Sequence, residues 1–144
     1  MLTDQQIQWV NLMQDWDASP ESISRAIEVP VDQVIEIVGD TNLQSNGRDE
    51  LKKALVKDND ELTMFWLLFR ESWRKTESPL SCAYAYSYLN KMLRPNSTVT
   101  FEACVELIEL VDSAFAALKT CSNCGRMMIN IPFLQPYARE CCRA

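Results

Sequence analysis

Histidine is absent from this sequence of 144 residues. Histidine is the commonest general base and a frequent metal ligand, so most hydrolytic triads and catalytic zinc sites have no candidate here. No nucleophile with a neighbouring base, and no set of catalytic carboxylates, can be named either. We therefore expect that the protein is not an enzyme.

Long apolar runs are also missing. None reaches the roughly 18 to 20 residues that a helix needs to cross a bilayer, and the first residues, MLTDQQIQWVNLMQDW, are polar and acidic, unlike a secretory signal. We expect no membrane association and a cytoplasmic location. In that compartment the six cysteines should be reduced thiols, some of them metal ligands, and not disulfides.

Positive charge is scarce in the first third of the chain. Residues 1–47 carry eight acidic residues against the single Arg25, a local net charge of −7, whereas residues 48–100 carry nine basic and seven acidic residues. The whole chain has a net charge of −6, which is unfavourable for binding nucleic acid alone. This division suggests an acidic partner-facing end and a mildly basic remainder, or alternatively a solvated acidic pair of helices.

Apolar spacing and capping residues predict an all-α fold. Hydrophobic residues make up 47% of the chain, enough for one compact core. Start and stop signals place helices at residues 3–17, 19–28, 31–38, 48–57, 61–75, 79–93 and, as the longest, from Thr98 or Thr100 to Leu118. Cys82 and Cys104 lie within apolar patterns and are expected to be small core residues. We predict a helical domain at residues 1–119 and a small cysteine module at residues 120–144.

The helices at residues 19–38 have the outline of a helix-turn-helix. However, the second of them, VDQVIEIV, contains two acidic residues and no basic one. In the major groove those carboxylates would lie among phosphates. A structural or partner-binding pair of helices is therefore the alternative to a DNA-reading unit.

The last 24 residues carry the clearest chemical motif. Cys121 and Cys124 are separated by two residues and are followed by Gly125, as in a zinc knuckle, and Cys141 and Cys142 come after 16 intervening residues. This spacing predicts one structural zinc ion held by thiolates. Adjacent cysteines cannot repeat the knuckle, so either Cys142 is the fourth ligand or the site has three thiolates and another donor. A redox dithiol is the alternative, but no strand-to-helix turn of the kind that carries such motifs precedes it.

The second half of the chain contains TMFWLLFRESW, SCAYAYSYLNKML and FEACVELIELVDSAFAALKTCSNCG, followed by the later cysteine pair. On these stretches the chain resembles the FlhC family, the zinc-containing subunits of the bacterial FlhD–FlhC flagellar master activator and their relatives on conjugative mobile elements. The similarity covers residues 60–144 and, more loosely, residues 19–38. The family pattern places Cys121, Cys124 and Cys141 on ligand positions, and its fourth position falls on Ala144, so Cys142 is the substitute.

The resemblance implies a helical subunit that assembles with an FlhD-like partner, binds an extended promoter in double-stranded DNA and recruits RNA polymerase. By residue type, the candidate phosphate contacts are Arg48, Lys52, Lys53, Arg70, Arg74, Lys75, Arg126, Arg139 and Arg143. Such contacts set affinity and salt dependence more than sequence choice. The alternative is an interaction protein that sequesters an FlhD-like partner without binding DNA, which the acidic first third would favour.

Overall fold

Seven helices and one two-stranded sheet form within residues 2–39 and 46–134, which are the residues that the computed structural model describes. The fold is mostly helical, and the sheet is an addition that the sequence did not predict. The elements are α1 (Asp4–Asp15), α2 (Pro20–Ile27), α3 (Val31–Val38), α4 (Gly47–Lys57), α5 (Asn59–Thr76), α6 (Ser81–Asn90), α7 (Phe101–Asp112), β1 (Ala117–Thr120) and β2 (Met127–Asn130).

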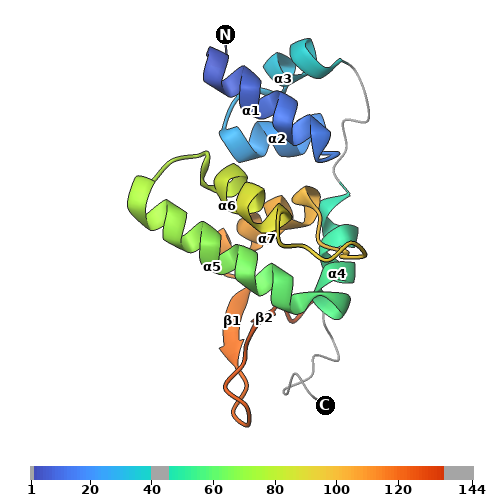
Figure 1. The fold of residues 1–144 in the computed structure, drawn as a ribbon, viewed down its shortest axis with the longest axis vertical. Helices are drawn as coiled ribbons and strands as arrows, with labels where there is room; N and C mark the ends of the chain where they lie inside the picture. The colour runs from blue at the N-terminus through green and yellow to red at the C-terminus, as the bar shows by residue number, and fades with distance from the viewer. Residues whose placement is uncertain (1, 40–45, 135–144) are drawn as a thin grey trace.

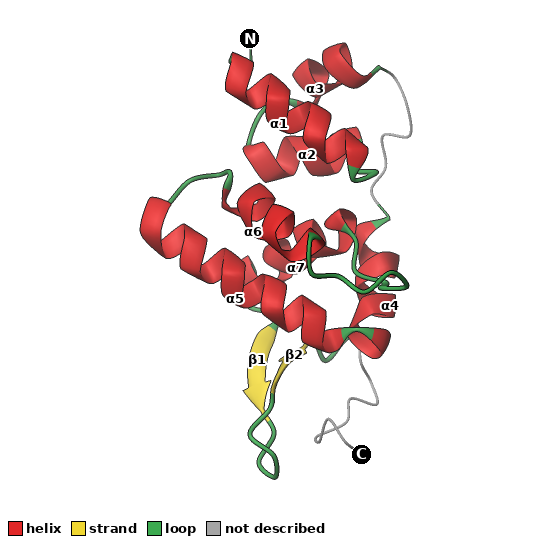
Figure 2. Cartoon of the chain, viewed as in Figure 1, coloured by secondary structure: helices red, strands yellow, loops and turns green. Residues whose placement is uncertain are grey.

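Three parts follow one another along the molecule. Figure 1 shows the N-terminal unit, α1–α3, at one end, the helical body, α4–α7, in the middle, and the hairpin of β1 and β2 projecting from the body at the other end. Figure 2 shows how small the share of strand is beside the helices. None of the described helices combines the length and the apolar character needed to cross a membrane.

Local capping explains where the helices of the N-terminal unit begin. The Thr3 hydroxyl accepts the Gln6 N–H at 3.1 Å, and the Gln6 side chain in turn accepts the Thr3 N–H at 2.9 Å, which completes a capping box before α1. Ser19 accepts the Ser22 N–H at 3.2 Å and is followed by Pro20 at the first position of α2. These predicted helix starts are confirmed.

The helical body contains most of the core. Helix α4 packs on α7, and α5 packs on α6. Cys82 is 4% exposed and Cys104 is fully buried, so their prediction as core residues is confirmed, and burial raises the pKa of both thiols. The largest fully buried side chains of the described chain include Phe65, Phe101, Met13, Ile23, Leu51, Leu62, Leu89 and Leu107.

The C-terminal end of α7 differs from the prediction. The apolar stripe predicted a helix to Leu118, the longest in the chain, but α7 has 12 residues and α5 has 18. The chain leaves α7 through Ala114, whose φ is +64°, and the Phe115 N–H then donates to the Leu110 carbonyl at 2.8 Å. Leu118 lies in β1 opposite Ile129 of β2. Pairing with β2 therefore overrides the helical propensity of this segment.

Candidate functional site

The hairpin brings Cys121 and Cys124 onto one tight turn. Strands β1 and β2 are antiparallel, with Thr120 opposite Met127, and residues 121–126 connect them. The Cys121 N–H donates to the Arg126 carbonyl at 2.8 Å, and the Gly125 N–H donates to the Cys121 carbonyl at 2.8 Å. Gly125 has a φ of +74°, a conformation that residues with a Cβ rarely adopt, which explains why glycine follows the second cysteine.

The donor set of this turn fits part of a structural zinc site. Two thiols on a turn closed by a glycine are the half-site that a knuckle contributes to tetrahedral zinc. Cys121 is 4% exposed and Cys124 is exposed. No group of three or more residues with histidine, cysteine or carboxylate donors that could hold a metal occurs within residues 2–39 and 46–134. The other two predicted ligands, Cys141 and Cys142, lie outside the described residues, so a complete site would depend on them.

The first turn of α5 holds the hairpin on the helical body. The Asn59 side-chain amide donates to the Ile129 carbonyl, and its oxygen accepts the Ile129 N–H, both at 3.0 Å. The amide thus pairs with β2 as a neighbouring strand would. Arg126, at the end of the cysteine turn, forms an ion pair with Asp60. Asn59 and Asp60 were not among the predicted site residues, because no local pattern connects them to residues about 70 positions later.

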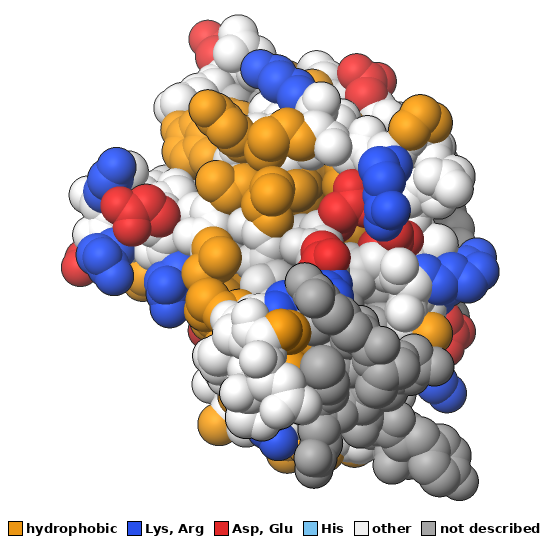
Figure 3. Space-filling view, turned by 60° about the horizontal axis from the view of Figure 1, so that its bottom comes forward, with side chains coloured by type: hydrophobic (Ala, Val, Ile, Leu, Met, Phe, Trp, Pro, Cys, Tyr) orange, Lys and Arg blue, Asp and Glu red, His pale blue; other side chains and the backbone are white. Residues whose placement is uncertain are grey.

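The candidate phosphate contacts do not form one patch. Lys52 and Lys53 are exposed on α4, whereas Arg70, Arg74 and Lys75 are exposed toward the C-terminal end of α5. Helix α5 has 18 residues, and a helix of that length extends about 27 Å. Figure 1 shows its C-terminal end on the opposite side of the body from α4. On the face drawn in Figure 3, basic side chains lie at both sides, with acidic side chains among them.

Several of these cations already have acidic partners. Arg48 contacts Glu106 at 2.9 Å and lies 5.1 Å from the ring centre of Phe133. Glu71 lies 3.7 Å from Arg74 and 3.5 Å from Lys75. Of the other candidates, Arg126 pairs with Asp60, and Arg139 and Arg143 lie outside the described residues. The sequence therefore located the cations but not the carboxylates that neutralise part of their charge.

Residues 19–38, for which a helix-turn-helix was predicted, contain two helices, α2 and α3, joined by a short turn. Glu28 has a left-handed φ of 55°, and Pro30 precedes α3. Val34 of α3 is fully buried, while Asp32 and Glu36 are exposed. The outer face of α3 is thus acidic, which disfavours its insertion into a DNA groove. A DNA-reading role for residues 19–38 stays a prediction, with partner binding as the alternative.

A row of carboxylates on α7 fixes the N-terminal unit to the body. Glu102 is 6% exposed and accepts hydrogen bonds from the Ser19 N–H and the Ser22 hydroxyl. Glu106, at 7% exposure, lies 3.3 Å from Arg25, which also pairs with Glu109. Positions 102, 106 and 109 share one face of a helix. Their spacing within an apolar helix is the only signal in the sequence for this interface, which was not predicted.

Comparison with known proteins adds no relative to this picture. No protein-family model, no curated protein and no solved structure matches the chain.

Proposed function

We propose that the chain is an FlhC-like subunit of a DNA-binding transcription activator, which acts in a hetero-oligomer with an FlhD-like partner and recruits RNA polymerase. The observation that carries this proposal is the cysteine turn of the hairpin, mounted on a helical body through Asn59. Together with the resemblance of residues 60–144, it supports a helical subunit with an attached zinc module.

In this proposal one zinc ion is structural and is held by Cys121, Cys124, Cys141 and Cys142. Two of the thiols belong to the hairpin turn, and 16 residues separate Cys124 from the other two. A metal held by four thiolates has no open position for substrate, and its binding free energy stabilises the fold around it. The zinc would tie the end of the chain to the hairpin.

The partner is needed to supply positive charge. The chain has a net charge of −6, and Arg48, Arg74, Lys75 and Arg126 have carboxylate partners of their own. In the complex, Arg126, Arg139 and Arg143 of the zinc module, with the exposed Lys52 and Lys53, would contact phosphates. These contacts position the complex and do not read the sequence.

A co-expression experiment tests the proposal. We expect the complex with an FlhD-like protein to contain one zinc ion per chain and to retain promoter fragments. Substituting Cys121→Ser together with Cys124→Ser should remove the zinc, whereas Ser122→Ala in the same turn should not. A complex without zinc would contradict the proposal.

The salt dependence of DNA binding shows whether the cations of the zinc module contact phosphates or only contribute to the net charge. The triple substitution Arg126→Gln, Arg139→Gln and Arg143→Gln should lower the slope of log affinity against log salt by about 0.9 for each phosphate that the variant no longer neutralises. Lys57→Gln, Lys91→Gln and Lys119→Gln make the same change in net charge at exposed positions outside the candidate set. If both triple variants lower the slope equally, the zinc module is not part of the interface.

The second candidate function is an interaction protein that sequesters an FlhD-like partner without binding DNA. The exposed carboxylates Asp32 and Glu36 of α3 favour it, because they form an acidic surface suited to a basic partner. A stable, zinc-containing complex that retains no DNA at low salt would establish this function instead.

A further inference from the structure

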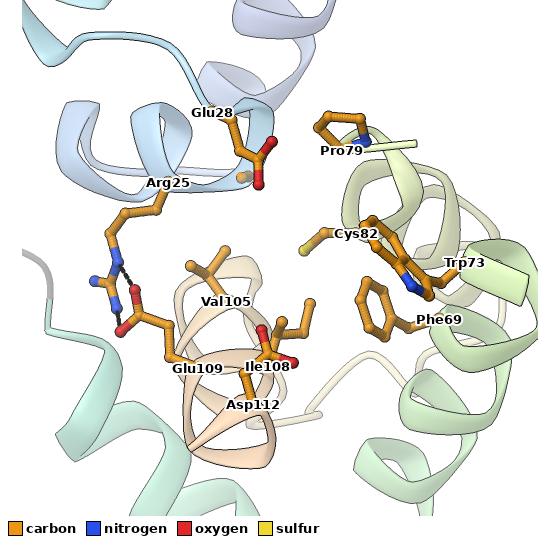
Figure 4. Close-up of a pocket in the computed structure, with 11 residues that line it drawn as sticks. Arg25, Glu28, Phe69, Trp73, Pro79, Cys82, Val105, Ile108, Glu109 and Asp112 are labelled. Carbon is orange, nitrogen blue, oxygen red and sulfur yellow. Dashed lines mark hydrogen bonds and ion pairs between the residues drawn. The ribbon is translucent and has the colours of Figure 1, made fainter. Parts of the chain in front are cut away.

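A pocket of about 420 Å³ lies where the N-terminal unit meets the helical body. Helices α2, α5, α6 and α7 all contribute to its lining, as Figure 4 shows. The volume falls in the range of small-molecule sites, roughly 300–1,000 Å³. None of the described residues that line the pocket belongs to the cysteine turn or to the candidate phosphate contacts.

One wall of the pocket is aromatic and aliphatic. Phe69 and Trp73 project from α5, with ring centres 6.3 Å apart and planes inclined by 24°. Val105 and Ile108 of α7 line the opposite part of the pocket in Figure 4. Trp73 is 44% exposed, so its indole ring is open to a ligand. Such a wall can bury an apolar body, and an indole face also attracts cations.

The charged groups around the pocket are mostly acidic. Among the described lining residues, Glu28, Glu109 and Asp112 supply three carboxylates, and Arg25 is the single cation. Arg25 is committed to Glu109 and Glu106, and Figure 4 shows its guanidinium paired with Glu109 at the side of the pocket. Within the described chain, Glu28 and Asp112 have no ion-pair partner, so the pocket retains an uncompensated negative charge.

The surroundings of Asp112 disfavour the charged form of its carboxyl group. Burial raises the pKa of this carboxyl group, and the neighbouring charge of Glu109 raises it further. A cation bound in the pocket would offset the repulsion between the two carboxylates. An anion would add to it, and a neutral ligand would leave it unchanged.

We propose that the pocket binds a small organic cation, with an alkyl or aryl body against Trp73 and Phe69 and an ammonium or guanidinium group between Glu28 and Asp112. The apolar wall supplies affinity for the body. The two carboxylates select the positive charge. This binding does not depend on the zinc binding or the DNA binding proposed above.

Three probes of nearly equal shape test the selectivity: 4-phenylbutylamine, 4-phenylbutanol and 4-phenylbutyrate. The amine is protonated at neutral pH, since alkylammonium groups have a pKa of roughly 10.4. Isothermal titration calorimetry of the full chain should give a Kd for the amine at least tenfold lower than that for the alcohol. The carboxylate probe should show no saturable binding.

Paired substitutions locate the site. Glu28→Gln with Asp112→Asn should raise the Kd of the amine to that of the alcohol, and Trp73→Ala should weaken both. Asp32→Asn with Glu36→Gln makes the same change in charge on α3, outside the pocket, and should change neither. Circular dichroism checks folding. Equal binding of amine and alcohol, no saturable binding of the amine, or equal weakening by the two acidic double variants would overturn the proposal.

Discussion

The N-terminal unit and the hairpin are attached to the same helical body by different kinds of interaction. The N-terminal unit is held by buried carboxylates of α7 and by aromatic packing, in which Trp16 stacks on Tyr86 with ring centres 4.8 Å apart. The hairpin is held by apolar packing of β2 on α5, where Ile129 is buried, by one neutral amide, Asn59, and by one partly exposed ion pair. Breaking a contact to a buried charge costs more than breaking one between neutral groups.

This difference indicates which part of the molecule a bound metal ion would stabilise most. The carboxylates that hold the N-terminal unit have their partners within the described chain. The hairpin pairs two strands of four residues each, and a two-stranded hairpin alone is marginally stable in water. A zinc ion at the cysteine turn, as proposed, would add stability at the end of the hairpin that projects from the body.

The largest effect is expected from Arg25→Ala. Among the described residues, the substitution leaves Glu106, whose side chain is 9% exposed, with only the exposed Arg48 as a partner, and it leaves Glu109 without an ion pair. Removing one partner from a buried pair typically costs 3–5 kcal/mol, so we expect a loss of about 3 kcal/mol in the free energy of unfolding. Urea denaturation followed by tryptophan fluorescence measures it.

Arg74→Ala is the matched control for that experiment. Arg74 and its partner Glu71 are both well exposed, and such pairs contribute at most about 1 kcal/mol. If the two alanine variants lose equal stability, the carboxylates of α7 do not hold the N-terminal unit in the way the structure indicates.

Asn59→Ala should have a smaller and more local effect. It removes both hydrogen bonds to the backbone of Ile129, for an expected loss of about 1.5 kcal/mol. Amide hydrogen exchange should speed up in β1 and β2 and stay unchanged in α1–α3. Asn90→Ala, at the exposed end of α6, serves as the control and should change neither region. Faster exchange throughout the chain would show that the hairpin is not a separately attached element.

The sequence predicted the local features of the fold and missed the long-range ones. Thr3 and Ser19 cap helices because each bonds to an N–H three residues away, which is visible in the sequence. The end of α7 at Asp112 depends on pairing with β2, so its apolar stripe was wrongly extended to Leu118. The cysteine turn was recognisable from its spacing, whereas its anchor Asn59 was not. The cations were likewise visible, but the partners of Arg48 and Arg126, which are Glu106 and Asp60, lie on elements far away in the sequence.

The smallest effect, opposite in sign, is expected from Glu50→Gln on α4, whose carboxyl group is repelled by Glu102 of the α7 row. Burial raises the pKa of Glu50 above 4.5, and the charges of Glu102 and Asp17 raise it further. A carboxyl group with a raised folded-state pKa stabilises the fold when protonated, and this stability is lost as the pH rises through that pKa. The glutamine variant should therefore gain less than about 1 kcal/mol in the free energy of unfolding at pH 7, because a partly exposed group has a reduced effect. Below about pH 4 it should gain nothing, because the carboxyl group is then protonated.

Thermal unfolding at the two pH values measures this difference, and Glu36→Gln, at an exposed position of α3, is the control. A gain that is the same at both pH values would mean that the substitution acts through packing and not through charge.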